Sequence, residues 1–308
     1  MKIFMTGATG VVGTRVVPLL RDAGHSITGM ARSPENRETL AQLGATPVDA
    51  DLFDVESLRR AMAGHDVVLN LATSVPSSTT KMMMRSAWRR NDRIRSQGSA
   101  AVATAAIAEG VARLVQEAFG PTYPDRGDAW IDESTPLAPA AHTTSSVDAE
   151  RSAMRFAEQG GVGVVLRFGL FYGPDHTMQA MLDMIAKGWA PFPGDPRAFI
   201  SSLAQDDAAT AVVAALEAPS GIYNVVEDDP MRRGELAASL ARASGMNPPK
   251  ALPKWLVPLS GSVLRLLARS ERLSNKRFRS VTSWSPRYAR ASDAWDDVLE
   301  QLGMVAAR

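Results

Sequence analysis

Short apolar runs alternate with longer amphipathic stretches through most of the chain. Each run has the length of a β-strand, and the stretches between them repeat apolar residues at helical spacing. The run at 66–73 is apolar almost throughout, which is typical of a parallel strand buried on both faces. This alternation predicts an α/β fold with a Rossmann-like, doubly wound parallel sheet. The expected strands are 3–5, 26–31, 46–49, 66–73, 113–119, 162–168 and 221–226.

The first expected strand ends in three glycines spaced three residues apart, and a helix follows to Gly24. In a dinucleotide-binding turn the first glycine permits the tight bend, the second lets the backbone approach a pyrophosphate, and the third lets the helix pack closely. The helix N-terminus then attracts the anion. A turn that binds nothing is the alternative. The predicted cofactor-binding residues here are Gly7, Thr9, Gly10, Val11, Val12 and Gly13.

The end of the second strand indicates which dinucleotide is bound. An acidic residue at this place accepts hydrogen bonds from the ribose hydroxyls of NAD. Here Ala31 stands in that place and Arg32 follows it. Because an arginine can neutralise a 2′-phosphate and no carboxylate repels one, we expect NADP(H) to be preferred over NAD(H). The alternative is that Arg32 is a solvated loop residue.

Residues 6–13, Thr-Gly-Ala-Thr-Gly-Val-Val-Gly, resemble the T-G-x-x-G-x-x-G fingerprint of the short-chain dehydrogenase/reductase superfamily. The chain length resembles that of its extended, nucleotide-sugar epimerase/dehydratase branch. The resemblance implies that Asp51 and Leu52 bracket the adenine. It also implies that the end of the fourth strand, at Leu71, Ala72 and Thr73, passes the pyrophosphate and the nicotinamide ribose.

Residues 166–174 resemble the family's L-R-x-x-x-x-Y-G-P segment, where the chain leaves the sheet. The resemblance implies a dinucleotide-binding domain at 1–172 plus 198–226 and a smaller, mostly helical substrate-binding cap at 173–197 plus 227–308. The expected cap helices are 178–187, 233–244, 255–268 and 293–302. A further helix, to residue 216, is expected to be capped by Asp206 or Asp207. The expected substrate-pocket residues are Phe119, Tyr172 and Trp189.

The family's catalytic residues are missing from the expected places. Phe119 stands where the family has a serine or threonine, and none of the four tyrosines is followed by lysine four residues later. In the usual mechanism that lysine lowers the pKa of the tyrosine, which then moves the proton that accompanies hydride transfer. The candidate replacements are His142, whose unperturbed pKa near 6.5 suits proton transfer, and Tyr123 and Glu117 near the fifth strand.

Composition excludes several other kinds of site. The 308 residues carry a net charge of +1 and no cysteine, so disulfides, thiolate catalysis and cysteine-bound zinc are ruled out. The four histidines lie far apart and show no metal-binding spacing. An arginine- and methionine-rich segment at 82–95 is either a lid over an anionic substrate or a solvated face; no pattern typical of nucleic-acid binding accompanies it.

We expect a cytoplasmic protein, because no signal peptide or membrane-spanning run is recognisable. The leading hypothesis is an atypical reductase or epimerase-type enzyme that binds NADP(H) and acts on a small molecule. A cofactor-binding redox sensor without turnover is the second hypothesis, and a cyclase, isomerase or lyase that uses the same pocket is the third. A homodimer is possible, because the resembled branch often pairs through helices that correspond to 99–110 and 146–158.

Overall fold

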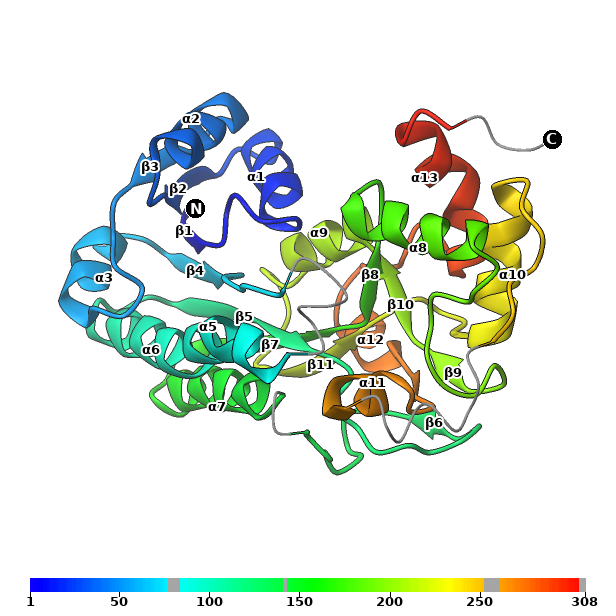
Figure 1. Ribbon diagram of the computed structural model, residues 1–308. Coiled ribbons are helices and arrows are strands. Elements are labelled where there is room, and N and C mark those ends of the chain that lie inside the picture. Colours follow the sequence, from blue (N-terminus) through cyan, green and yellow to red (C-terminus); the bar gives the residue numbers. More distant parts are fainter. Residues whose placement is uncertain (77–83, 141–142, 252–260, 305–308) are drawn as a thin grey trace.

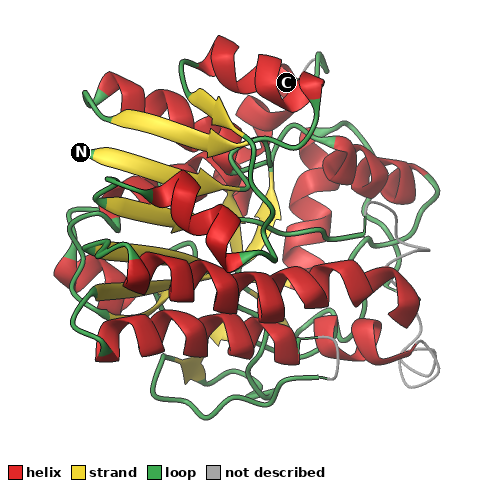
Figure 2. Cartoon of the chain, turned by 90° about the vertical axis from the view of Figure 1, so that its left-hand side faces the viewer, coloured by secondary structure: helices red, strands yellow, loops and turns green. Residues whose placement is uncertain are grey.

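The computed structural model describes residues 1–76, 84–140, 143–251 and 261–304. Its main element is a seven-stranded sheet in the order β11-β7-β5-β4-β1-β2-β3, and every neighbouring pair is parallel. Figure 2 shows these strands pointing the same way between layers of helices. The predicted doubly wound parallel sheet is confirmed. Its strands are β1 (Lys2–Thr6), β2 (Ser26–Met30), β3 (Thr46–Val48), β4 (Val67–Asn70), β5 (Arg113–Phe119), β7 (Val162–Phe168) and β11 (Gly221–Val225).

Helices cover both faces of the sheet, and each layer buries its own apolar core. One face carries α1 (Gly13–Asp22), α2 (Pro34–Leu43) and α9 (Gln205–Ala214), and the other carries α3 (Val55–Met62), α6 (Ser99–Ala108) and α7 (Thr144–Glu158). Helix α3 begins where the Asp54 carboxylate accepts a hydrogen bond from the Glu56 amide at 3.0 Å and so caps the helix N-terminus.

The remaining elements form a smaller part beside the carboxyl ends of the strands, at the right of Figure 1. Three short strand pairs lie there: β8 (Leu170–Tyr172) with β10 (Ser202–Ala204), β9 (Phe199–Ile200) with β12 (Met231–Arg232), and β6 (Trp130–Ile131) with β13 (Arg272–Leu273). The helices are α8 (His176–Ala186), α10 (Arg233–Ala243), α11 (Gly261–Leu267), α12 (Lys276–Val281) and α13 (Trp295–Gln301). Leu182, Leu240 and Trp295 are buried in its core.

Within the described residues, two expected helices differ at their starts from the sequence-based prediction. The helix expected at 255–268 is described only from Gly261 to Leu267 as α11, since residues 252–260 lie outside the described residues. The expectation that Asp206 or Asp207 caps the N-terminus of the helix that runs to residue 216 is wrong. Helix α9 starts at Gln205 without a side-chain cap. Asp206 instead pairs with Arg15 at 2.8 Å, and Asp207 accepts a hydrogen bond from the Arg287 amide.

The last part of the chain contributes to both cores. Phe278 and Trp284 are buried in the sheet core, where the ring of Phe278 lies 5.5 Å from that of Tyr223 on β11. Trp295 is buried in the core of the smaller part. The segment after residue 227 is therefore not purely a cap, while the exact division of the chain into two domains stays a prediction.

Candidate functional site

The glycine turn after β1 leaves room only for glycine at two of its three positions. A Cβ atom on Gly7, whose φ is +67°, would lie 2.4 Å from the carbonyl oxygen of Leu71. One on Gly13 would lie 2.2 Å from the carbonyl oxygen of Gly7. The Gly10 amide donates to that same oxygen at 2.9 Å. The turn is thus a tightly packed cradle that opens onto the N-terminus of α1.

This cradle lies at the point where the winding of the sheet reverses. Strand β1 pairs with β2 on one side and β4 on the other, so the strand order runs outward in opposite directions from this point and a crevice forms at the strand ends. Gly10 and Val11 are exposed on its rim, Thr9 is half-buried, and Val12 packs in the core. The arrangement suits a pyrophosphate group.

Two neighbouring strand ends carry the residues predicted to contact the adenosine. Arg32, two residues after the end of β2, is exposed and forms no ion pair with any residue that the structure describes. Ser33 accepts a hydrogen bond from the Asn36 amide and so caps α2. After β3, Asp51 is exposed and accepts from the Phe53 amide at 2.9 Å, while Leu52 is buried. Because Arg32 is exposed and forms no ion pair with a described residue, its guanidinium is available to contact a ligand.

A buried polar network fixes the end of β4 beside the cradle. Thr6 donates to Asn70 Oδ1 at 2.5 Å, and the Asn70 amide donates to Ser99 at 3.1 Å and to Gln116 at 2.7 Å. Because the side-chain amide of Asn70 is satisfied on three sides, it holds β1, β4 and β5 in register. Beyond it, Leu71 is buried, Ala72 is half-buried and Thr73 is exposed.

Glu117 lies where β5 continues past the end of β4. It is buried and pairs with Arg95, which is also buried, at 2.5 Å. Burial raises the pKa of Glu117 although Arg95 opposes the shift. Its second oxygen, Oε2, has no hydrogen-bond partner among the described residues, but it is also closed to solvent. Whether Glu117 moves a proton during turnover stays a prediction.

Arg95 belongs to a π-helical turn at Ile94–Gly98, which follows a short 3-10 helix at Arg85–Trp88 and α5 (Arg89–Arg93). In contrast to the buried Arg95, the arginines at positions 85, 89 and 90 are exposed. Met82 and Met83 lie outside the described residues, so the lid hypothesis for this segment stays a prediction.

Tyr123 is fully buried, and its hydroxyl is engaged on both sides. It accepts from Arg167 Nη1 at 2.6 Å and donates to Asn224 Oδ1 at 2.8 Å, while Arg167 also pairs with Glu150 at 2.6 Å. Burial raises the pKa of Tyr123 to about 12, which opposes formation of a phenolate. This geometry gives the side chain a structural role and does not support a catalytic one. His142 lies outside the described residues.

The three expected substrate-pocket residues are dispersed. Phe119 is half-buried at the end of β5 and donates its amide to Ser146 at 2.8 Å. Tyr172 is buried in the core of the smaller part, where its hydroxyl donates to Glu227 at 2.5 Å. Trp189 follows α8 and is 44% exposed. The structure does not bring them together.

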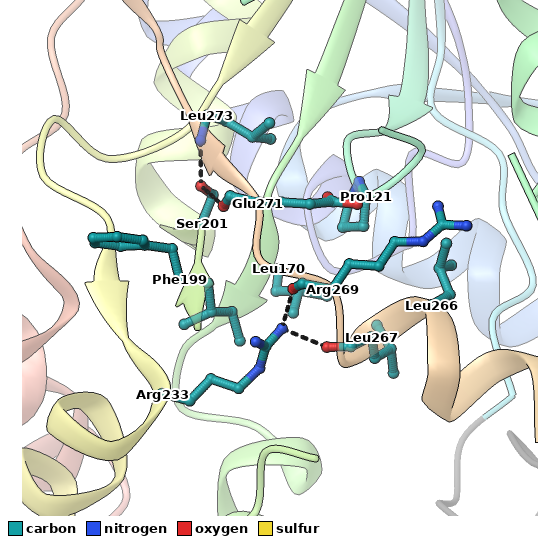
Figure 3. Close-up of a pocket in the computed structure, with 11 residues that line it drawn as sticks. Pro121, Leu170, Phe199, Ser201, Arg233, Leu266, Leu267, Arg269, Glu271 and Leu273 are labelled. Carbon is teal, nitrogen blue, oxygen red and sulfur yellow. Dashed lines mark hydrogen bonds between the residues drawn. The ribbon is translucent and has the colours of Figure 1, made fainter. Parts of the chain in front are cut away.

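Sequence reasoning missed a cavity of about 20 Å³ between the strand ends and the smaller part (Figure 3). Its polar walls include Arg233 on α10 and Glu271 before β13, and its apolar walls include Leu170, Ile200 and Leu266. One signal was available. Arginine at the first position of a helix is unfavourable to the helix dipole, so a side-chain contact is the expected reason for it.

The described residues contain no cluster of three or more histidines, aspartates and glutamates that could hold a metal ion. Within the same ranges, no helix has both the length and the apolar character needed to cross a membrane.

Comparison with known proteins agrees with the fold and the cradle. Residues 7–157 match the family model described as NAD(P)H-binding. The chain is 29% identical, over 97% of its length and 99% of the relative's, to the 3-diazoavenalumate denitrifying reductase of a Streptomyces species. It is 28% identical to the 2-alkyl-3-oxoalkanoate reductase of Shewanella oneidensis, over 89% of this chain and 76% of that one.

Among solved structures, UDP-glucose 4-epimerase of Thermus thermophilus in complex with NAD superimposes with a TM-score of 0.78. It is 22% identical, with 98% of this chain and 99% of that chain covered. At this identity the match establishes the fold alone. Together, the two comparisons show a match to an NAD(P)H-binding family over residues 7–157 and, over nearly the whole chain, the fold of an NAD-binding epimerase.

Proposed function

We propose that the chain is an NADPH-dependent reductase that acts on a small molecule. The observation that carries the proposal is the glycine cradle, where added Cβ atoms at Gly7 and Gly13 would collide with backbone. Such a cradle fits a pyrophosphate held at the N-terminus of α1. When bound there, the dinucleotide supplies a hydride. The exposed Arg32 supports preference for a 2′-phosphate.

The surroundings of β5 favour a substrate that needs no proton from the protein. Reduction of a carbonyl requires a proton besides the hydride, because an alkoxide would otherwise form. The chain has no Tyr-x-x-x-Lys sequence, and the hydroxyl of Tyr123 is committed to Arg167 and Asn224. The free oxygen of Glu117 is enclosed. A proton-independent acceptor would remove the need for these groups.

An aryl diazonium ion is such an acceptor. A hydride forms the new C–H bond at the ring carbon, the C–N bond breaks, and its electron pair leaves with N₂, so no proton is consumed. The name of the Streptomyces relative denotes reduction of a diazo compound with loss of nitrogen. We therefore propose diazonium-type electrophiles as the substrate class of this chain, ahead of the ketones that the name of the Shewanella relative indicates.

Cofactor selectivity is tested by calorimetric titration with NADPH, NADH, NADP and NAD. We expect NADPH to bind more tightly than NADH. Arg32→Gln should weaken NADPH binding by about 10- to 100-fold, which corresponds to the loss of a charge-assisted contact, and leave NADH binding unchanged. Gly10→Ala places a methyl group on the exposed rim of the cradle and should weaken both nucleotides equally.

Equal affinity of the wild type for NADPH and NADH, or an Arg32→Gln variant that weakens both alike, would contradict the preference. Absence of any nucleotide binding would contradict the reductase proposal itself. Tight NADPH binding without turnover on any acceptor would favour the redox-sensor hypothesis.

The substrate class is tested with benzenediazonium and acetophenone as parallel acceptors. We expect the protein to speed NADPH oxidation by benzenediazonium, with deuterium from 4-deuterated NADPH recovered in benzene and N₂ released in equal amount. The Gly10→Ala variant controls for the uncatalysed reaction of diazonium salts with NADPH. Faster turnover of acetophenone than of benzenediazonium would sink the proton-independent assignment and require another proton donor.

A further inference from the structure

Arg233, the first residue of α10, carries a guanidinium with unused donors. The side chain is buried, with 4% of the residue exposed. Its Nη2 donates to the carbonyl oxygens of Leu267 and Arg269, both at 2.6 Å, at the C-terminal end of α11. Its Nε and Nη1 have no hydrogen-bond partner among the described residues. Because a buried guanidinium with free N–H groups is costly, these donors call for an acceptor.

Glu271, directly before β13, lines the same cavity, and Figure 3 shows it on a different segment of the chain than Arg233 on α10. Only 6% of the residue is exposed, and its Oε1 has no partner among the described residues. The two side chains do not hydrogen-bond each other. Burial raises the pKa of Glu271 well above its usual range, although Arg269 and Arg233 oppose the shift. A protonated Glu271 offers a second donor.

The cavity lies at the edge of the sheet where the glycine cradle also lies. Pro121 follows the end of β5, and Leu170 follows the end of β7, and both line the cavity. Parallel strands place these carboxyl ends on the same side as the end of β1. The volume of about 20 Å³ suits one or two water molecules or a carboxylate group, but not a whole substrate. The rest of a ligand would extend beyond the cavity.

We propose that this cavity binds the carboxylate end of the small molecule on which the protein acts, with Arg233 and Glu271 as its hydrogen-bonding residues. The proposal rests on the proposed function for the statement that the ligand is a substrate. The apolar walls at Leu170, Ile200 and Leu266 suit the carbon skeleton next to the carboxylate. Neutral ligands of the same shape would leave the free N–H groups of Arg233 without a charged partner.

The test measures binding rather than turnover, with benzoate and methyl benzoate as probes. We expect calorimetry to show benzoate bound by the wild type and methyl benzoate bound about 10- to 100-fold more weakly. Arg233→Lys keeps the positive charge but loses donors, and should weaken benzoate by a similar factor. Glu271→Gln keeps a donor and the side-chain volume, so we expect its benzoate affinity to stay within about twofold of the wild type.

Arg232→Lys serves as the matched control. Arg232 precedes Arg233, but it pairs with Asp128 at 3.0 Å on the surface and lies outside the cavity. This variant should bind benzoate like the wild type. Arg233 also contacts the end of α11, so Arg233→Lys could fail to fold. In that case Glu271→Met takes its place. Methionine removes the second donor and should weaken benzoate binding.

Absence of benzoate binding to the wild type, equal affinity for the ester, or undiminished binding by a folded Arg233→Lys variant would each overturn the proposal. The failure of this site is distinguishable from failure of the proposed function. NADPH binding without benzoate binding refutes the cavity assignment alone. Benzoate binding without nucleotide binding refutes the reductase and leaves a carboxylate site.

Discussion

At the scale of single residues, Glu227 shows how burial raises the pKa of a carboxyl group. Its carboxylate is fully buried and accepts hydrogen bonds from Tyr172 at 2.5 Å and from Ser202 at 2.8 Å. These bonds favour the charged form, but burial dominates and raises the pKa to about 7. The native state therefore holds a proton that the unfolded chain, with its ordinary glutamate pKa, has already released.

This difference predicts a stability that depends on pH. Between the unfolded pKa near 4.5 and the folded pKa of about 7, the native state binds more protons, so the free energy of unfolding should fall as pH rises. Above pH 7 the loss attributable to Glu227 is about 3 kcal/mol. Thermal melts from pH 5 to pH 8 should show this decline in the wild type and a shallower one in Glu227→Gln.

Glu158→Gln, at an exposed position near the end of α7, should follow the wild type through the same series. Parallel curves for the wild type and Glu227→Gln would show that Glu227 does not titrate in this window.

At the scale of elements, one charged group joins three segments that are distant in the sequence. Arg167 on β7 forms a bidentate ion pair with Glu150 on α7, at 2.8 Å and 2.6 Å, and donates to Tyr123 after β5. All three side chains are buried. Removing one partner of such a group leaves an uncompensated charge in the protein interior, which costs more than the pair itself contributes.

We therefore expect Arg167→Met to lower the free energy of unfolding by about 3 to 5 kcal/mol, as measured by urea denaturation. The double variant Glu150→Met/Arg167→Met should recover part of that loss, because no charge remains buried. Arg151→Met removes a largely exposed ion pair with Asp148 on the same helix. It should lower the free energy of unfolding by at most about 1 kcal/mol. Equal losses for Arg167→Met and Arg151→Met would refute the argument.

At the scale of the whole molecule, local patterns predicted the sheet well. The runs at 113–119 and 162–168 have the bounds of β5 and β7, because each is mostly apolar and ends directly before a glycine. The glycine cradle was equally predictable, because its three-residue spacing is visible in the sequence and Gly13 meets the backbone of Gly7 and Ala8 within the same turn. Such features depend on neighbours in the sequence.

The parts that were not predicted depend on distant contacts. Tyr172 was expected in the substrate pocket, yet the departure of β8 from the sheet carries it into the core of the smaller part, against Trp295 at 5.1 Å. The Arg233–Glu271 cavity joins α10 to a segment well beyond it in the chain, and no spacing in the sequence reveals that meeting.

The burial of Phe278 and Trp284 in the sheet core has a consequence for synthesis of the chain. The apolar face covered by these rings, which includes Tyr223 of β11, is complete only after residue 284 has left the ribosome. Until then the nascent protein exposes an aggregation-prone apolar surface on an otherwise assembled sheet. Chaperones bind surfaces of this kind. A truncation before residue 278 would make that exposure permanent, so shortened forms of this protein should accumulate as aggregates.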